Sequence, residues 1–417
     1  MFDVNKVRND FPMFKNNPNL IYFDSAATSF KPQVVIDRVK EYYEKSNTSI
    51  HRGDYDLSVS VSKEYDDTRE IVRQFINAKD KNSIVFTSGS SSSLNLVAYG
   101  LGLKYLKKGD VILTTEVEHA SNILPWFKVA EKTGATIEYI PLNSDATFDF
   151  DKYAKCFDNE NIKIVSMTQV SNVMGYVYPI KDIARFAHEH GAIVNIDGAQ
   201  SVPHIKIDVT DLDIDFLSFS SHKMCGPAGI GVLYGKYDLL EKCDPYMYGG
   251  GANARFDNCG NIILKNTPEK FEAGTPNIEG VLGLNAAINY LQQLGMENIE
   301  QYGNELTQYF MDRLSKLDNV EVYNKNSSSG IVTFNVKDIF AQDAASYFNK
   351  MGIAVRTGNH CAKILVNVIG VSETIRASMY FYNTKQEIDK FIDVIKETTL
   401  SKCVDSVLWW IKKLKER

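Results

Sequence analysis

Lys223 could act as a nucleophilic amine, because it follows the short apolar run Asp215–Ser220. A lysine at the end of a buried strand is desolvated, which lowers the pKa of its amine and suits it to forming a Schiff base with an aldehyde. For Lys223 alone, a surface lysine just beyond a strand is the more common explanation. Its chemistry therefore depends on what the neighbouring strands deliver to the same place.

A serine-rich segment, Ser88–Ser93, follows the run Ser83–Thr87 and precedes a helix expected from about Leu94. Free backbone N–H groups, hydroxyls and the positive end of a helix dipole together bind phosphate. Simple N-capping of the helix would explain the same residues. The segment is not a P-loop, because no Gly-Lys-Ser/Thr follows it.

Three further polar side chains follow other apolar runs: His119, Asn172 and Asp197. Alone, such a histidine is usually a structural hydrogen-bonding group and such an asparagine a turn residue. A buried carboxylate, however, needs a cationic partner. Together these groups match pyridoxal phosphate. They supply a phosphate site, a carboxylate for a pyridinium nitrogen, an imidazole to stack on the ring, and the amine of Lys223 for the aldehyde.

The elements that must position these side chains form a repeating pattern. Between about residues 83 and 235, short β-branched runs alternate with stretches of helical apolar spacing, such as Ile180–His190 before Gly191. Apolar strands separated by helices predict a mostly parallel sheet covered on both faces, and ligands bind at the carboxyl ends of its strands. The seven expected strands are Ser83–Thr87, Val111–Thr115, Thr136–Ile140, Lys163–Thr168, Ala192–Asp197, Asp215–Ser220 and Gly229–Tyr234.

The fold class expected is therefore α/β, with a large seven-stranded domain and a smaller α+β domain. We assign residues 31–280 to the large domain, 281–400 to the small one, and 1–30 to a segment packing across both. Residues 236–280 read as a long functional loop, followed by a single helix from about Glu279 to Leu317. The small domain is expected to contain the strands Ile331–Val336, Ile353–Arg356 and Thr374–Met379 and helices over 341–350 and 385–399.

The last segment, 401–417, is expected to be an amphipathic helix. Its apolar residues at helical spacing are Val404, Val407, Leu408, Ile411 and Leu414. This pattern predicts a helix docked on the small domain. A helix that lies on a membrane surface or binds a partner is the alternative, because basic residues gather at its end.

Composition excludes several classes of protein. The 417 residues include 46 Lys and Arg against 52 Asp and Glu, a net charge of −6 that argues against a nucleic-acid partner. No stretch of 18 uncharged apolar residues predicts a membrane span, and the start MFDVNKVRND has no secretory apolar region. Six scattered cysteines without a Cys-x-x-Cys pair predict a reduced, cytoplasmic protein without a zinc site.

The sequence resembles the SufS-like cysteine desulfurases, within the class V aminotransferase group of fold-type I pyridoxal-phosphate enzymes, over about residues 15–400. The segments that carry the resemblance are Tyr22–Ala27, His51–Gly53, Glu118–His119, Ser171–Val173, Asp197–Gln200, Ser220–Lys223, Phe271–Pro276, Arg356–Ala362 and Arg376–Ser378. This chain departs from the usual Gly-His-His-Cys-Ala by reading Gly358-Asn359-His360-Cys361-Ala362.

The resemblance implies a role for each matched residue. Lys223 would bind the cofactor covalently, His119 would stack on its ring and move protons, Asp197 would pair with the ring nitrogen, and Gln200 would bind the phenolic oxygen. The residues implied for the phosphate are Ser91, Ser220 and His222, with Ser90 nearby and Thr275 reaching the phosphate of the neighbouring subunit. Asn172 would contact cofactor and substrate, and the other implied substrate residues are Arg376, His51 and Arg356. No metal ligand is implied.

Cys361 would be the nucleophile that takes sulfur from L-cysteine, giving L-alanine and a persulfide. His360 and Arg356 are expected to be positive neighbours that favour its thiolate. The family further implies a homodimer, delivery of sulfur to an acceptor protein of the SufE or SufU kind, and a role in iron–sulfur cluster assembly. The alternatives are a selenocysteine lyase, another class V enzyme, or a non-catalytic relative that acts as a binding protein.

Overall fold

The large domain of the computed structural model, which describes residues 2–415, is built on a seven-stranded sheet with the order β2-β8-β7-β6-β5-β3-β4. Only β8 runs antiparallel to its neighbours, so the predicted mostly parallel sheet is confirmed. The strands are β2 (Ile84–Thr87), β3 (Val111–Thr114), β4 (Thr136–Tyr139), β5 (Ile162–Thr168), β6 (Ile193–Asp197), β7 (Phe216–Ser220) and β8 (Gly231–Gly235).

Alternate residues of these strands enter two separate apolar clusters, one on each face of the sheet. In β3, Ile112 packs in the cluster that contains Trp126, whereas Leu113 packs in the cluster that contains Ile183. Both faces are therefore buried, which explains the nearly continuous apolar runs. The helices of this domain are α3 (Gln33–Glu41), α4 (Asp56–Phe75), α5 (Ser90–Val97), α6 (Leu103–Tyr105), α7 (Ala120–Thr133), α8 (Phe150–Cys156), α9 (Ile180–Glu189), α10 (Val209–Leu212), α11 (Tyr237–Lys242) and α12 (Ile278–Leu294).

Helix α5 begins at Ser90, earlier than the expected start near Leu94. The carbonyl of Gly89 accepts the backbone N–H of Ser93 at 3.1 Å, so the serine run forms the first helical turn instead of a loop. Serines are tolerated there because the first N–H groups of a helix have no partner within the helix. The consequence is that Ser90 and Ser91 lie at the positive end of the helix dipole.

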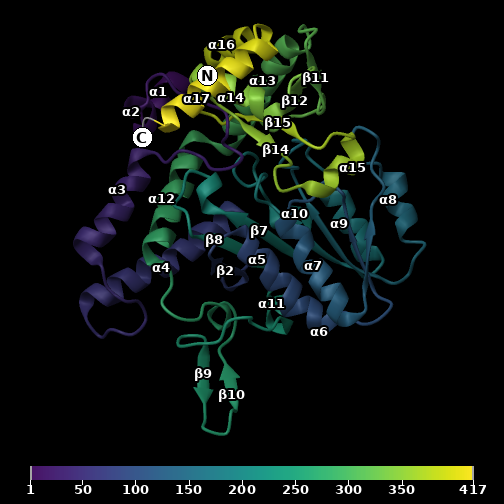
Figure 1. Ribbon diagram of the computed structural model, residues 1–417. Helices are drawn as coiled ribbons and strands as arrows, with labels where there is room; N and C mark the ends of the chain where they lie inside the picture. The colour runs from purple at the N-terminus through teal and green to yellow at the C-terminus, as the bar shows by residue number, and fades with distance from the viewer. Residues whose placement is uncertain (1, 416–417) are drawn as a thin grey trace.

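The segment 236–280 contains more regular structure than the loop predicted for it. After α11, the strands β9 (Asn253–Phe256) and β10 (Ile262–Leu264) form an antiparallel hairpin that projects from the large domain (Figure 1). Asp257 accepts the backbone N–H groups of Cys259 and Asn261 at 2.9 and 3.0 Å, which closes the turn. The short strands and the polar turn hid this hairpin from analysis of apolar periodicity.

The small domain contains a four-stranded antiparallel sheet with the order β11-β12-β15-β14. Its strands are β11 (Val320–Val322), β12 (Ile331–Val336), β14 (Arg356–Gly358) and β15 (Thr374–Ser378). Its helices are α13 (Met296–Leu314), α14 (Ala341–Lys350), α15 (Val366–Ile369) and α16 (Lys385–Lys396). The single helix expected over Glu279–Leu317 is wrong: Gly295, with φ +83°, separates α12 from α13, since glycine adopts that conformation without strain.

The expected strand Ile353–Arg356 is divided between two sheets. Its first half is β13 (Ile353–Ala354), which pairs in parallel with β1 (Ile21–Tyr22), and its second half begins β14. The N-terminal segment also contains α1 (Val4–Arg8) and α2 (Pro12–Asn16). Phe11 packs in the large-domain core, and Phe23 packs in the small-domain core. This segment therefore contacts both domains.

The C-terminal helix α17 (Leu400–Lys415) lies against α14, and it buries Cys403 and Ser406. Of the apolar residues expected to dock, Val404, Leu408 and Ile411 are exposed, so the buried face differs from the predicted one. The side chain of Leu414 and residues 416–417 lie outside the described part. Over residues 2–415, no helix has the length and apolar character needed to cross a bilayer.

Candidate active site

A cavity of about 490 Å³ lies where the carboxyl ends of β5, β6 and β7 face the small domain. It is lined by side chains from both domains, including Lys223 of the large one and Cys361 of the small one. The residues predicted for cofactor or substrate that line it are Ser90, Ser91, His119, Asn172, Asp197, Gln200, Ser220, His222, Lys223, Arg356, Cys361 and Arg376. His51 and Thr275 are the predicted residues that do not line this cavity.

One end of the cavity gathers hydroxyl and N–H donors. The Ser220 hydroxyl accepts the backbone N–H of Ser90 at 2.7 Å and donates to the Ser90 hydroxyl at 2.9 Å, and the Ser91 and Ser121 hydroxyls lie 2.6 Å apart. Gly231 lets the backbone of Gly89, which lines this end, pack closely on β8, because a Cβ at position 231 would lie 2.4 Å from Gly89 Cα. Donors at the start of a helix, around a glycine, form an anion site.

The middle of the cavity holds a carboxylate and an amide from the end of β6. Asp197 Oδ1 accepts the backbone N–H of Ala199 at 2.9 Å, which fixes the side chain. Gln200 Nε2 donates to the Ala26 carbonyl at 2.8 Å, whereas the buried Gln200 Oε1 has no hydrogen-bond partner among the described residues. A buried polar atom without a partner is costly, so Gln200 has an unused acceptor directed at a ligand site.

His119 is the N-cap of α7, where its Nδ1 accepts the backbone N–H of Ser121 at 3.1 Å. Burial lowers the pKa of His119, the nearby Asp197 carboxylate opposes this, and the charges of Lys223 and Arg376 lower it further. The ring is therefore neutral near pH 7, with the proton on Nε2, because Nδ1 is used as an acceptor. A neutral ring with a fixed tautomer suits stacking and proton transfer.

Glu118, the residue before His119, is buried and hydrogen-bonds to three neighbouring segments of the site. This role of Glu118 was not predicted from the sequence. Its carboxylate accepts hydrogen bonds from the Thr115 hydroxyl at 2.6 Å, Asn122 Nδ2 at 2.7 Å and the backbone N–H of Thr168 at 3.0 Å. Burial raises the pKa of Glu118 to about 7, although these three bonds favour the charged form. Glu118 thus ties the end of β3 to the end of β5.

Lys223 ends the short 3₁₀ turn that follows β7. Burial lowers the pKa of its amine to about 8, partly offset by the attraction of Asp197, while Arg376 and Arg356 lower it further. A lysine with this pKa is partly neutral near physiological pH, and its neutral, attacking form is far more populated than that of an ordinary lysine. His222 beside it is neutral, since burial and the charge of Lys223 lower its pKa to about 4.

Cys361 follows β14, and its side chain is exposed. His360 and Cys361 both have left-handed backbone, with φ +52° and +59°, a conformation that costs energy for residues other than glycine. Two hydrogen bonds hold this loop to the large domain: Ala120 N donates to the Cys361 carbonyl at 2.7 Å, and Asn172 Nδ2 donates to the His360 carbonyl at 2.8 Å. The thiol is therefore presented at the cavity by contacts between domains.

His360 does not supply the positive charge expected next to Cys361. Its ring is buried, and Nε2 lies 2.9 Å from the Thr374 hydroxyl. Burial, with the charges of Arg376 and Arg356, lowers the pKa of His360 to about 3, so the ring is neutral. Of the two residues predicted to favour the thiolate, only Arg356 carries a charge.

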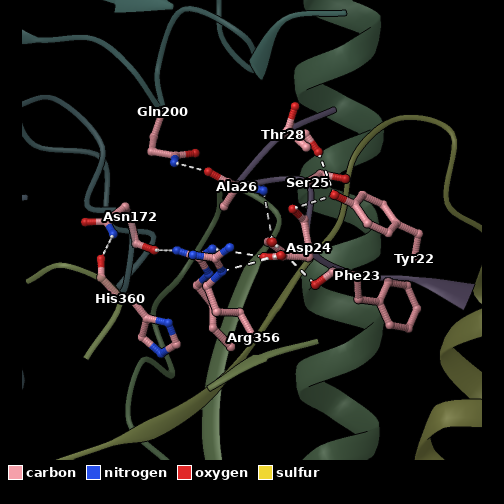
Figure 2. A network of polar contacts seen from close by, with 12 residues as sticks. Tyr22, Phe23, Asp24, Ser25, Ala26, Thr28, Asn172, Gln200, Arg356 and His360 are labelled. Carbon is pink, nitrogen blue, oxygen red and sulfur yellow. Dashed lines mark hydrogen bonds and ion pairs between the residues drawn. The ribbon is translucent and has the colours of Figure 1, made fainter. Parts of the chain in front are cut away.

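Arg356 and Arg376 contact Asp24 at the small-domain side of the cavity, and Figure 2 shows Asp24 and Arg356 in this network. Arg376 Nη1 donates to the Asn172 carbonyl at 2.9 Å, and Nη2 lies 3.2 Å from Asp24 Oδ1. Arg356 Nε lies 3.4 Å from Asp24 Oδ2. In the sequence, Asp24 stands out only as part of the segment Tyr22–Ala27, which carries the family resemblance. Its partners are more than 300 positions away, so no local pattern indicated its role.

His51 and Thr275 lie elsewhere on the chain, near a second cavity of about 370 Å³. His51 Nε2 is 3.8 Å from Asp66 Oδ1, and its ring meets Tyr65 edge to face. Thr275 is exposed, between Gly274 and Pro276, which line this cavity. Within one chain these two residues are therefore separate from Lys223.

The main cavity fits pyridoxal phosphate. The hydroxyl and helix-terminal donors match a phosphate, the free Gln200 Oε1 and the Asp197 carboxylate match polar atoms of a protonated pyridine ring, and the Lys223 amine matches an aldehyde. His119 completes the set with a flat neutral ring. Arg356 and Arg376, which also line the cavity, match the carboxylate of an amino acid.

Comparison with known proteins identifies the family of this chain. The family model described as aminotransferase class V matches residues 21–391. The chain is 45% identical to a probable cysteine desulfurase of Halalkalibacterium halodurans, covering 95% of this chain and 98% of that one. It is 43% identical to a probable cysteine desulfurase of Staphylococcus epidermidis, covering 95% and 97%.

Solved structures show the same similarity. The cysteine desulfurase CsdA of Escherichia coli superposes with a TM-score of 0.89 at 34% identity, covering 97% of this chain and 99% of that one. The apo structure of a cysteine desulfurase from Thermococcus onnurineus NA1 superposes with a TM-score of 0.90 at 38% identity, covering 94% and 97%.

Proposed function

We propose that Cys361 is the residue that takes sulfur from L-cysteine. The chain belongs to the class V aminotransferase family and is a pyridoxal-phosphate-dependent cysteine desulfurase. The observation that carries this proposal is the single cavity lined by the Lys223 amine, the Cys361 thiol and the buried Arg376. Of the six cysteines, Cys361 is the one that lines it.

The residues that would hold the cofactor follow from the donor set. Ser90, Ser91, Ser220 and His222 would bind its phosphate, Asp197 its ring nitrogen and Gln200 its phenolic oxygen. When bound, pyridoxal phosphate supplies an electron sink that acidifies the Cα hydrogen of the amino acid. Lys223 Nζ, with its lowered pKa, is the group that would remove this proton.

Sulfur transfer is then a displacement by Cys361. Its thiolate attacks the sulfur of L-cysteine, an S–S bond forms, and the C–S bond breaks with its electron pair remaining on carbon. The carbon takes up a proton, so L-cysteine and the Cys361 thiol give L-alanine and a Cys361 persulfide without an added oxidant or reductant. The exposed position of Cys361 supports onward transfer from this persulfide to an acceptor protein.

The biological setting belongs to the same proposal. We infer a cytoplasmic homodimer that supplies sulfur for iron–sulfur cluster assembly through an acceptor of the SufE or SufU kind. The placement of His51 and Thr275 supports the dimer, because these predicted cofactor and substrate residues lie away from Lys223 and can serve a neighbouring subunit's site.

The test compares Cys361→Ala with Cys259→Ala, which removes an exposed thiol from the β9–β10 hairpin. Alanine release from L-cysteine under a reductant should fall at least about 100-fold in Cys361→Ala, the scale for removal of a nucleophile, and should not change in Cys259→Ala. L-cysteine should still change the cofactor absorbance of Cys361→Ala. Near-normal alanine release by this variant would assign the sulfur chemistry to another route and reject the proposal.

A further inference from the structure

Asn359 lies two positions before Cys361, and none of the steps above assigns it a role. Its side chain Oδ1 accepts the backbone N–H of Cys361 at 3.1 Å, and its backbone carbonyl accepts the N–H of Ala362 at 2.8 Å. These two N–H groups belong to the two peptide bonds that flank the Cys361 Cα. Asn359 therefore receives the N–H side of both peptide bonds next to the thiol.

The large domain donates to the other side of the same two peptide bonds. Asn172 Nδ2 donates to the His360 carbonyl at 2.8 Å (Figure 2), and the backbone N–H of Ala120 donates to the Cys361 carbonyl at 2.7 Å. A peptide bond is planar, so hydrogen bonds at its N–H and at its C=O together fix its orientation. Both peptide planes beside Cys361 are thus held between Asn359 and the large domain.

The backbone at Cys361 needs this support. His360 and Cys361 have φ of +52° and +59°, and the left-handed region is unfavourable for residues with a Cβ. Such strain persists only where the surrounding contacts over-determine the conformation. An asparagine side chain that accepts the N–H two residues further on stabilises a turn of this kind. Without the Asn359 acceptor, the strained turn would lose one of the four hydrogen bonds that restrain it.

We propose that Asn359 is a positioning residue for sulfur transfer, which holds the backbone of Cys361 so that the thiolate can reach the sulfur of bound L-cysteine. This inference rests on the proposed function, in which Cys361 takes the sulfur. Asn359 is exposed and does not line the main cavity, so it acts through Cys361 and not on the ligand. A nucleophile held in the reactive geometry reacts faster, because its orientation is fixed before the reaction begins.

The experiment separates L-cysteine binding from sulfur transfer in the holoenzyme. Asn359→Leu removes the acceptor at similar size, whereas Asn359→Ser keeps a hydroxyl that can accept the same N–H. In a single turnover with L-cysteine, alanine formation should slow at least about tenfold in Asn359→Leu and by less than about threefold in Asn359→Ser. The L-cysteine concentration that half-saturates the change in cofactor absorbance should stay the same in both variants, because the cavity lining is intact.

Alkylation of Cys361 by iodoacetamide depends on the thiol and not on its alignment with L-cysteine. Its rate across pH, followed by mass spectrometry with the exposed Cys259 as internal reference, should not fall in Asn359→Leu. A parallel loss of alkylation and alanine formation would mean that Asn359 sets the reactivity of the thiol, and it would overturn the positioning role. Unchanged alanine formation in Asn359→Leu, or an equal loss in Asn359→Ser, would overturn it as well.

Asn159→Leu is the matched control. Asn159 Oδ1 accepts the backbone N–H of Asn161 at 3.1 Å, with the same spacing of two residues, just before β5 begins. The main cavity lies at the opposite, carboxyl end of β5, so alanine formation should not change in this variant. An equal loss in Asn159→Leu would assign the effect to a general loosening of turns and would overturn the proposal.

Ala120→Pro tests the same restraint from the large domain if Asn359→Leu does not fold. Ala120 is the first residue of α7, where proline is tolerated, and His119 before it has the extended backbone that proline favours. Loss of this N–H should slow alanine formation at least about threefold at unchanged L-cysteine binding, and an unchanged rate would overturn the restraint.

Cys361→Ala distinguishes failure of this inference from failure of the proposed function. Near-normal alanine formation in Cys361→Ala would reject the proposed function itself. Loss of alanine formation in Cys361→Ala, together with a normal rate in Asn359→Leu, would reject only the role of Asn359.

Discussion

Replacing Lys223 with methionine should stabilise the cofactor-free protein near pH 7, although it removes the reactive amine. Burial lowers the pKa of Lys223 from 10.5 to about 8, net of the attraction of Asp197, so the folded state holds this proton less well than the unfolded chain. One pKa unit corresponds to about 1.4 kcal/mol, and the difference of about 2.5 units therefore costs the wild type about 3 kcal/mol. Methionine keeps a similar volume without the charge.

The pH dependence gives the prediction its sign. The unfolded chain binds more protons at this lysine between pH 8 and pH 10.5, so the stability of the wild type rises with pH across that window. The advantage of Lys223→Met should be largest below pH 8 and should disappear near pH 10.5. The assay is urea unfolding of both cofactor-free proteins, followed by tryptophan fluorescence, at several pH values from 6.5 to 10.5.

Lys236→Met is the control with the opposite sign. Burial lowers the pKa of Lys236, but contacts with Asp213 at 2.7 Å and Asp215 at 2.9 Å overcome this and raise it. This lysine therefore contributes stability below pH 10.5, and its removal should destabilise the protein throughout the measured range. If Lys223→Met were no more stable than wild type at pH 7, or kept its advantage at pH 10.5, the cost assigned to the buried amine would be refuted.

Three further outcomes are expected. Borohydride reduction of the holoenzyme followed by digestion should place the pyridoxyl label on Lys223. A label on Lys31, the half-buried lysine that donates to the His222 carbonyl at 3.2 Å, would contradict the site. Sedimentation should show a homodimer, and a fully active monomer on dilution would refute the shared site. Thr275→Ala should weaken cofactor binding severalfold. Glu118→Leu should lower the free energy of unfolding, measured by denaturant titration, by about 2–4 kcal/mol, because it leaves three hydrogen-bond donors unpaired. An effect below about 1 kcal/mol would argue against a structural role for the Glu118 hydrogen bonds.

The sequence was sufficient for the seven-stranded sheet of the large domain because its information there is local. Each expected strand was a short β-branched run between helical stretches, and all seven coincide with observed strands to within two residues. The polar residues at their carboxyl ends meet in one cavity because parallel strands end at the same edge of the sheet.

What the sequence did not reveal depends on contacts between distant segments. The pairing of β1 with β13 and the contacts of Asp24 have no local pattern, so the divided strand and the arginine network were not predicted. The neutral state of His360 was missed for a related reason, since it follows from burial near two arginines. At Gly295 the glycine itself was a usable signal, and the apolar spacing on both sides outweighed it.

The N-terminal segment that completes the small domain has a consequence for how this protein is made. Asp24 emerges from the ribosome early, whereas Arg376 is 352 positions further along the chain. At a synthesis rate of roughly 5–20 residues per second, the C-terminal strands against which Ile21 and Phe23 pack are made on the order of 20–70 s after these two residues. During this interval the large-domain sheet can fold while two apolar side chains remain uncovered. Synthesis rate and chaperone supply should therefore affect the yield of this protein more through its first 30 residues than through its central sheet.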